Sequence, residues 1–206
     1  MTFLKILPMA FVMIAGPQIL SAIFLATSED WRRNSAAYVL GAALSITLFV
    51  TLAFLLGGAA SDGSDSQNNT LYIIVLVLLL AAMLRTFLKR EESGPPKWMG
   101  KLQTAKPRFS FLLGAALLGV FPTDIITSVA VGTYLAAHGD EWIDALPFIG
   151  LTLLFLSLPA LTLLLLGERG QAFLPKARDW MNTNSWIVNE LVLTLFVVIT
   201  INSLAG

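Results

Sequence analysis

Six long apolar segments, separated by short polar stretches, limit what this chain can fold into. A helix needs about 20 apolar residues to cross the hydrocarbon core of a bilayer, and each segment is close to that length. The strands of a transmembrane barrel would instead give shorter segments of alternating polarity. The sequence therefore predicts an all-α, polytopic membrane protein with six transmembrane helices. The segments cover residues 3–26, 36–56, 71–88, 109–136, 143–166 and 186–204.

Composition agrees with a membrane location. Only 13% of the residues are charged and 56% are hydrophobic, whereas soluble proteins carry about 25% charged residues. The net charge is zero, so bulk charge gives no reason to expect a nucleic-acid partner. The chain has no cysteine and one histidine, His138, which excludes thiol chemistry and makes a metal site unexpected. With no catalytic motif in view, we expect no enzyme activity and no cofactor.

The charges between the segments alternate in sign along the chain. With six spans, 12 of the 13 Lys and Arg residues fall on one side of the membrane, and only Lys5 falls on the other. Because cytoplasmic loops carry an excess of basic residues, we expect a multi-pass protein of the plasma (cell inner) membrane with both termini extracytoplasmic. The connecting charges are Arg32 and Arg33, Asp62 and Asp65, the basic stretch 85–108, Asp140, Glu141 and Asp144, and a final loop with Arg169, Lys176 and Arg178.

The six segments divide into two sets of three around the basic stretch. Since three is odd, two halves built on the same plan lie in opposite orientations in the membrane. Each half opens with a long helix that carries a proline and then a polar residue, and Gln18 and Asp124 both stand 15 residues from the start of their segments. The sequence predicts two inverted three-helix repeats, residues 1–90 and 109–206, joined by a basic cytoplasmic linker, residues 91–108.

Asp124 is the most informative residue, because it lies deep in an apolar segment. A charged side chain at that depth costs a few kcal/mol at least, so it should face the bundle interior or a water-filled cavity. Burial favours the neutral acid, which suits a proton-coupled site. Two structural interpretations stay open. Asp124 could cap a helix that begins after Pro122, or it could bond to Ser and Thr neighbours for packing.

Pro17 and Pro122 are expected to interrupt the first and fourth helices, because proline lacks an N–H and clashes with the preceding turn. Two breaks at corresponding positions of two halves indicate a central binding site, although many kinks serve only packing. Glu190, at the start of the sixth helix, is either a proton relay or a residue placed favourably on the helix dipole. The predicted substrate- or proton-binding residues are Pro17, Gln18, Ser21, Pro122, Thr123, Asp124, Thr127 and Ser128.

Short runs of residues in both halves carry a family resemblance. They are Leu7-Pro8-Met9-Ala10, Gly16-Pro17-Gln18-Ile19-Leu20-Ser21-Ala22, Thr27-Ser28, Arg32-Arg33-Asn34-Ser35-Ala36 with Gly41, and Phe121-Pro122-Thr123-Asp124. With these runs the chain resembles the GAP family, the peptidoglycolipid- or sulfolipid-addressing proteins of the lysine-exporter superfamily. The resemblance covers nearly the whole chain and implies a six-helix, two-repeat transporter that moves glycolipids toward the cell surface.

The same resemblance bears on chemistry at the centre of the protein. Some relatives in the superfamily export amino acids, and others carry electrons through paired cysteines in the first and fourth helices. This chain has Gln18 and Asp124 near those positions and no cysteine at all. Electron transfer is therefore excluded, whereas a central site between the two halves is still expected.

The primary hypothesis is a transporter that exports or flips a lipid-linked or amphipathic substrate, with Asp124 as the proton-responsive group. The expected partners are membrane lipids and a lipid-linked or small-molecule substrate, with no nucleic acid, and a homodimer is left open. The first alternative is an exporter of a small solute, either an amino acid or a cation. The second is a non-transporting scaffold or accessory subunit of a membrane complex.

Overall fold

The computed structural model confirms the all-α prediction over the residues it describes. These are residues 3–14, 16–60 and 97–184, together with residues 80, 84, 187, 190, 194, 197, 198 and 201 taken singly. The predicted segment 71–88 and most of segment 186–204 lie outside the described residues. The elements are α1 (Phe3–Ile14), α2 (Pro17–Ala26), α3 (Trp31–Ala60), η2 (Lys97–Thr104), α5 (Pro107–Val120), α6 (Pro122–Ala137), η3 (Trp142–Ala145), α7 (Leu146–Leu166) and α8 (Glu168–Thr183).

Two stretches of the described chain are long and apolar enough to cross a membrane, namely Trp31–Gly57 and Trp142–Leu166. A third span results if α5 and α6, which meet at an angle of 69°, count as one broken crossing. The exposed surface of α3 agrees with a lipid environment, because leucines recur along it at every fourth position, including Leu40, Leu44 and Leu48. These observations establish a membrane protein with two or three candidate spans in its described part. The full count of six remains a prediction.

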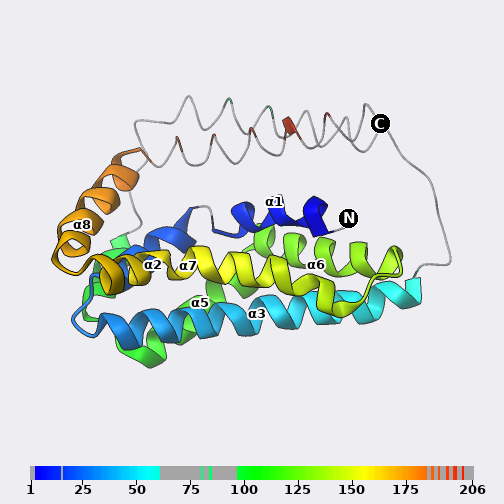
Figure 1. Ribbon diagram of the computed structural model, residues 1–206, viewed down its shortest axis with the longest axis horizontal. Helices are drawn as coiled ribbons and strands as arrows, with labels where there is room; N and C mark the ends of the chain where they lie inside the picture. The colour runs from blue at the N-terminus through cyan, green and yellow to red at the C-terminus, as the bar shows by residue number, and fades with distance from the viewer. Residues whose placement is uncertain are drawn as a thin grey trace.

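Helix α3 runs alongside α5 and α6 in the same direction, and α7 returns in the opposite direction (Figure 1). Helices α1 and α2 pack against α7 and lead back toward the end of the bundle where α3 and α5 begin. At that end the backbone N–H of Glu29, just after α2, donates to the carbonyl of Gln103. The chain segments α1–α2 and α5–α6 therefore run in opposite directions through the bundle.

Glycines bring the backbone of α3 into direct contact with α5 and α6. A Cβ atom on Gly114 of α5 would overlap the carbonyl oxygen of Tyr38, and one on Gly41 of α3 would overlap the carbonyl oxygen of Phe111. Gly132 of α6 lies in the same way against the carbonyl oxygen of Val50. Small residues permit such close approach of membrane helices, where van der Waals packing supplies much of the association energy.

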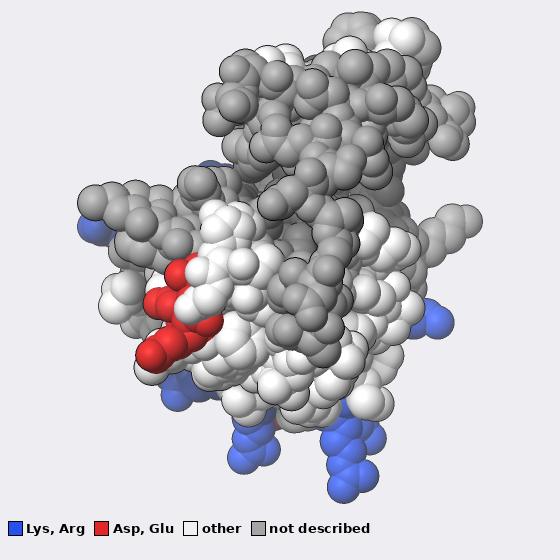
Figure 2. All heavy atoms as spheres, turned by 90° about the vertical axis from the view of Figure 1, so that its right-hand side faces the viewer, with Lys and Arg blue, Asp and Glu red and all other residues white. Residues whose placement is uncertain are grey.

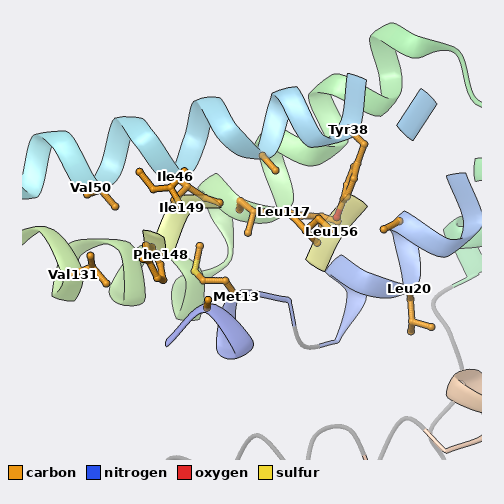
Figure 3. Close-up of a cluster of buried hydrophobic side chains, with 14 of the residues drawn as sticks. Met13, Leu20, Tyr38, Ile46, Val50, Leu117, Val131, Phe148, Ile149 and Leu156 are labelled. Carbon is orange, nitrogen blue, oxygen red and sulfur yellow. The ribbon is translucent and has the colours of Figure 1, made fainter. Parts of the chain in front are cut away.

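The core lies where α1, α2, α3, α5, α6 and α7 meet (Figure 3). It is built from large apolar side chains that are fully or almost fully buried, so it holds the interrupted helices against the continuous ones. Its members include Met13, Ile46, Val50, Leu117, Val131, Phe148, Ile149 and Leu156.

Charges separate toward the two ends of the bundle. Asp140, Glu141 and Asp144 follow α6, and acidic side chains gather on that end face (Figure 2). Arg32 and Arg33 open α3, and Lys106 and Arg108 open α5, at the opposite end. This distribution agrees with the alternation of charge along the sequence.

Two of the connections between the predicted spans contain helices. The connection that carries Arg169, Lys176 and Arg178 forms helix α8, which the sequence analysis did not predict. The helix forms because Leu174 is buried against Ala26 and Leu163, a tertiary contact that sequence periodicity does not reveal. The end of the predicted linker forms the 3-10 helix η2, in which Leu102 is fully buried.

Replacement of Gly114 by Ala tests the close contact between α3 and α5. Because the added methyl group would overlap Tyr38, we expect Gly114→Ala to lower the free energy of unfolding by about 1–3 kcal/mol. Gly150→Ala is the matched control, since nothing lies within 4 Å of a Cβ atom there. Thermal unfolding in detergent, followed by tryptophan fluorescence, measures both. Equal unfolding midpoints for the two variants would contradict the contact.

Candidate functional site

Both predicted helix interruptions are observed. Helix α1 ends at Ile14 and α2 begins at Pro17, after Gly16, whose φ of 87° is in the left-handed region that favours glycine. Helix α5 ends at Val120 and α6 begins at Pro122, after an extended residue. In each case proline occupies the first helical position, where its missing N–H costs nothing. The prolines thus create two new helix N-termini inside apolar segments.

The structure brings Gln18 and Asp124 together at these N-termini. Nε2 of Gln18 donates a hydrogen bond of 2.5 Å to Oδ2 of Asp124, which joins α2 to α6 across 106 residues of sequence. Gln18 is 2% exposed and Asp124 is 0% exposed. The side chain of Asp124 makes no capping hydrogen bond to α6. Because Asp124 lies in the first turn of α6, the helix dipole favours the negatively charged form of its carboxyl group. The side chain of Asp124 therefore makes a long-range contact with α2 and does not cap α6, so the capping interpretation is wrong.

Four of the seven buried side-chain atoms that have no hydrogen-bond partner in the described chain belong to this pair or to a serine one turn after it. They are Oε1 of Gln18, Oδ1 of Asp124, Oγ of Ser21 and Oγ of Ser128. Ser21 follows Gln18 by three residues and Ser128 follows Asp124 by four, so each hydroxyl shares a helix face with the polar group before it. Unpartnered buried polar groups are rare in folded proteins. Their concentration here marks a place suited to a proton, a water molecule or a polar group of a ligand.

Tyr38 belongs to the same cluster, although it was not among the site residues predicted from the sequence. Its ring is fully buried and projects from α3 into the interior (Figure 3). The hydroxyl donates to the backbone carbonyl of Gln18 at 2.8 Å. A tyrosine within an apolar helix was the available signal, because a buried phenol needs a partner, but the sequence does not identify that partner.

The other predicted site residues lie outside this cluster. Oγ1 of Thr127 donates to the carbonyl of Thr123 within α6, and both Thr123 and Pro122 are exposed. Glu190 is partly buried, its Oε1 has no partner, and no hydrogen bond in the described chain joins it to Asp124. Its relay role therefore stays a prediction. No group of three or more metal-binding side chains occurs among the described residues.

A second buried polar cluster, also missed from the sequence, has a different character. Nδ2 of Asn34 donates to Oγ of Ser28 and to the carbonyl of Ala105, each at 2.9 Å, and its Oδ1 accepts from Oγ of Ser110 at 3.1 Å. This network ties the end of α2 to the starts of α3 and α5. Because its hydrogen-bonding groups are satisfied, it has the properties of a structural junction.

One comparison with known proteins gives a match. A family model described as Sap, sulfolipid-1-addressing protein, matches residues 6–204. The match spans both interrupted helices and nearly the whole chain. Neither the curated proteins nor the solved structures contain a match to this chain.

A double-mutant cycle tests the pairing of Gln18 with Asp124. Gln18→Leu leaves the buried carboxyl without its donor, which should cost about 1–3 kcal/mol of stability. The double variant Gln18→Leu/Asp124→Leu should lose less than the sum of the single variants, by about 0.5–3 kcal/mol. A control cycle pairs Gln18→Leu with Thr162→Val, whose hydroxyl bonds the carbonyl of Leu158 within α7, and it should be additive. Additivity in both cycles would argue against the pair.

Proposed function

The chain belongs to the sulfolipid-1-addressing protein family, and we propose that it exports or flips a lipid-linked or amphipathic substrate, coupled to protons. The observation that carries the proposal is the Gln18–Asp124 pair, buried between two interrupted helices and surrounded by unpartnered oxygens. A carboxyl in an apolar segment is costly, and such residues mark substrate and proton pathways in membrane proteins.

Proton coupling is supported by the hydrogen-bonding chemistry of this pair. Gln18 donates a hydrogen bond to Oδ2 of Asp124, and Oδ1 of Asp124 has no partner in the described chain. A proton on Oδ1 turns that acceptor into a donor, so the charged and neutral forms of Asp124 favour different partners. A change of partner at the contact between α2 and α6 links proton binding to movement of α2 relative to α6.

Alternating access is the transport mechanism that fits interrupted helices. In inverted-repeat transporters, broken helices from each half meet near the middle of the bilayer, and one helix bundle moves against another around the site. The opposite directions of α1–α2 and α5–α6 support two such repeats, residues 1–90 and 109–206. On this proposal the end with the basic residues faces the cytoplasm, and both termini are extracytoplasmic.

The scarcity of buried charge supports an amphipathic substrate over a small ionic one. Among the buried polar side chains of the described chain, Asp124 is the only charged one. A zwitterionic amino acid needs compensating groups of both signs inside the membrane. The family description names a sulfolipid, and we adopt a sulfolipid as the probe substrate.

Asp124→Asn tests the proton coupling. In proteoliposomes with a fluorescent sulfolipid, a membrane-impermeant reductant reports how much probe reaches the outer leaflet. We expect a pH gradient to change the wild-type rate and Asp124→Asn to remove this response, because an amide cannot take up the proton. Asp179→Asn, which changes an exposed carboxylate of α8, should leave it intact. A full response in Asp124→Asn would refute the coupling role.

Pro122→Ala tests the need for the interruption. Alanine restores the backbone N–H and strongly favours helix, so α5 and α6 should tend to form one continuous helix that no longer offers an N-terminus at Asp124. We expect sulfolipid movement to fall to the level of empty vesicles. Pro147→Ala, at the exposed start of α7, should transport normally. Normal transport by Pro122→Ala would refute the need for the interruption, because proline would then matter only for stability.

A further inference from the structure

Helix α8 lies at the boundary of the membrane-spanning part of the chain. Leu164, Leu165 and Leu166, the last residues of α7, are 57%, 81% and 53% exposed, so the apolar outer surface of α7 continues to its final residue. The chain then turns at Gly167, whose φ is 51°, and α8 begins at once. Figure 1 shows α8 running across this end of the bundle, steeply inclined to α7. Helix α8 therefore begins where the exposed apolar surface of α7 ends.

The inward face of α8 is occupied by contacts within the protein. Gly170 packs closely on the carbonyl of Thr162, and Leu174 is 3% exposed. The guanidinium of Arg178 lies 5.2 Å from the ring centroid of Phe24 and pairs with Asp179. The orientation of α8 about its own axis is therefore fixed by the bundle.

The outward face of α8 carries two aromatic and two basic side chains, which we call the basic-aromatic stripe. Its residues are Arg169, Phe173, Lys176 and Trp180. They follow one another at spacings of four, three and four residues, so they share one face of the helix. Phe173 is 57% exposed and Trp180 is 53% exposed. Neither Arg169 nor Lys176 takes part in a salt bridge in the described chain.

We propose that the basic-aromatic stripe lies in the headgroup layer of the membrane and binds anionic lipid headgroups. Phe173 and Trp180 have no apolar cover in the described protein, and aromatic rings are favoured at the membrane interface. Arg169 and Lys176 lie between and beside these rings, where their charges complement anionic headgroups. Each basic residue close to an anionic surface contributes about 1 kcal/mol, or roughly fivefold in binding.

The bilayer is the occupant that the geometry favours over a protein partner. The stripe begins at Arg169, three residues after the exposed leucines that end α7, so a membrane around α7 would also reach α8. Lysines and arginines from other elements gather at the same end, including Lys106 and Arg108 at the start of α5. This inference concerns the membrane surface around the protein and holds whether or not the chain transports a substrate.

Single-cysteine variants of the full chain test the proposal, because the chain has no cysteine of its own. A nitroxide is attached at Phe173→Cys on the stripe or at Gln171→Cys, an exposed control on another face of α8. The protein is reconstituted in vesicles of phosphatidylcholine alone or with phosphatidylglycerol. Paramagnetic resonance then compares collisions of the label with oxygen and with a water-soluble nickel chelate. In anionic vesicles we expect the label at position 173 to be shielded from the chelate and the label at 171 to remain accessible.

Charge variants identify the headgroup contribution. Arg169→Gln/Lys176→Gln should raise chelate access at position 173 in anionic vesicles, by up to roughly fivefold for each charge removed. Glu168→Gln is the matched control on an exposed acidic residue of the same helix, and it should not raise access. Equal chelate access at positions 171 and 173 in all vesicles would overturn the proposal. Shielding of the label at position 173 that depends neither on lipid charge nor on the two basic residues would also overturn the proposal, and it would point to a protein contact.

Discussion

The hydrogen bond between Gln18 and Asp124 is the interaction around which the centre of this protein is organised. A buried carboxyl without a donor costs more than the bond itself is worth, so α2 and α6 must meet at their first turns. The two prolines make this meeting possible, because they start new helices inside segments that would otherwise run continuously. Tyr38 then ties α3 to the same point through the carbonyl of Gln18. One polar contact thus orients three helices.

The two buried polar clusters differ in how completely their groups are paired. Asn34 satisfies both ends of its amide and joins three segments at the basic end of the bundle. Gln18, Asp124, Ser21 and Ser128 each keep one polar atom without a partner. A fully satisfied network rigidifies a fold, whereas a partly satisfied one is strained or awaits a partner. This contrast is the physical reason for placing function at Asp124 and structure at Asn34.

Features set by covalent geometry or by length were predictable from the sequence. The apolar segments gave the helical class, the prolines gave both interruptions, and equal spacing within the halves singled out Gln18 and Asp124. Features that depend on tertiary packing were not predictable. The partner of Tyr38 is a backbone carbonyl twenty residues away, and Asn34 bonds to groups before and after its own helix. Helix α8 was missed because Leu174 finds its cover in α2 and α7.

The glycine contacts of α3 have a mechanical consequence. Where two helix backbones touch without side chains between them, no rotamer change can accommodate sliding of one helix along the other. Such sliding would therefore break all of the backbone contacts together. Gly41, Gly114 and Gly132 provide contacts of this kind between α3 and both α5 and α6. These three helices therefore form one rigid unit. On the proposed mechanism, a motion that parts Gln18 from Asp124 falls to α1 and α2, between which the helix is interrupted at Gly16.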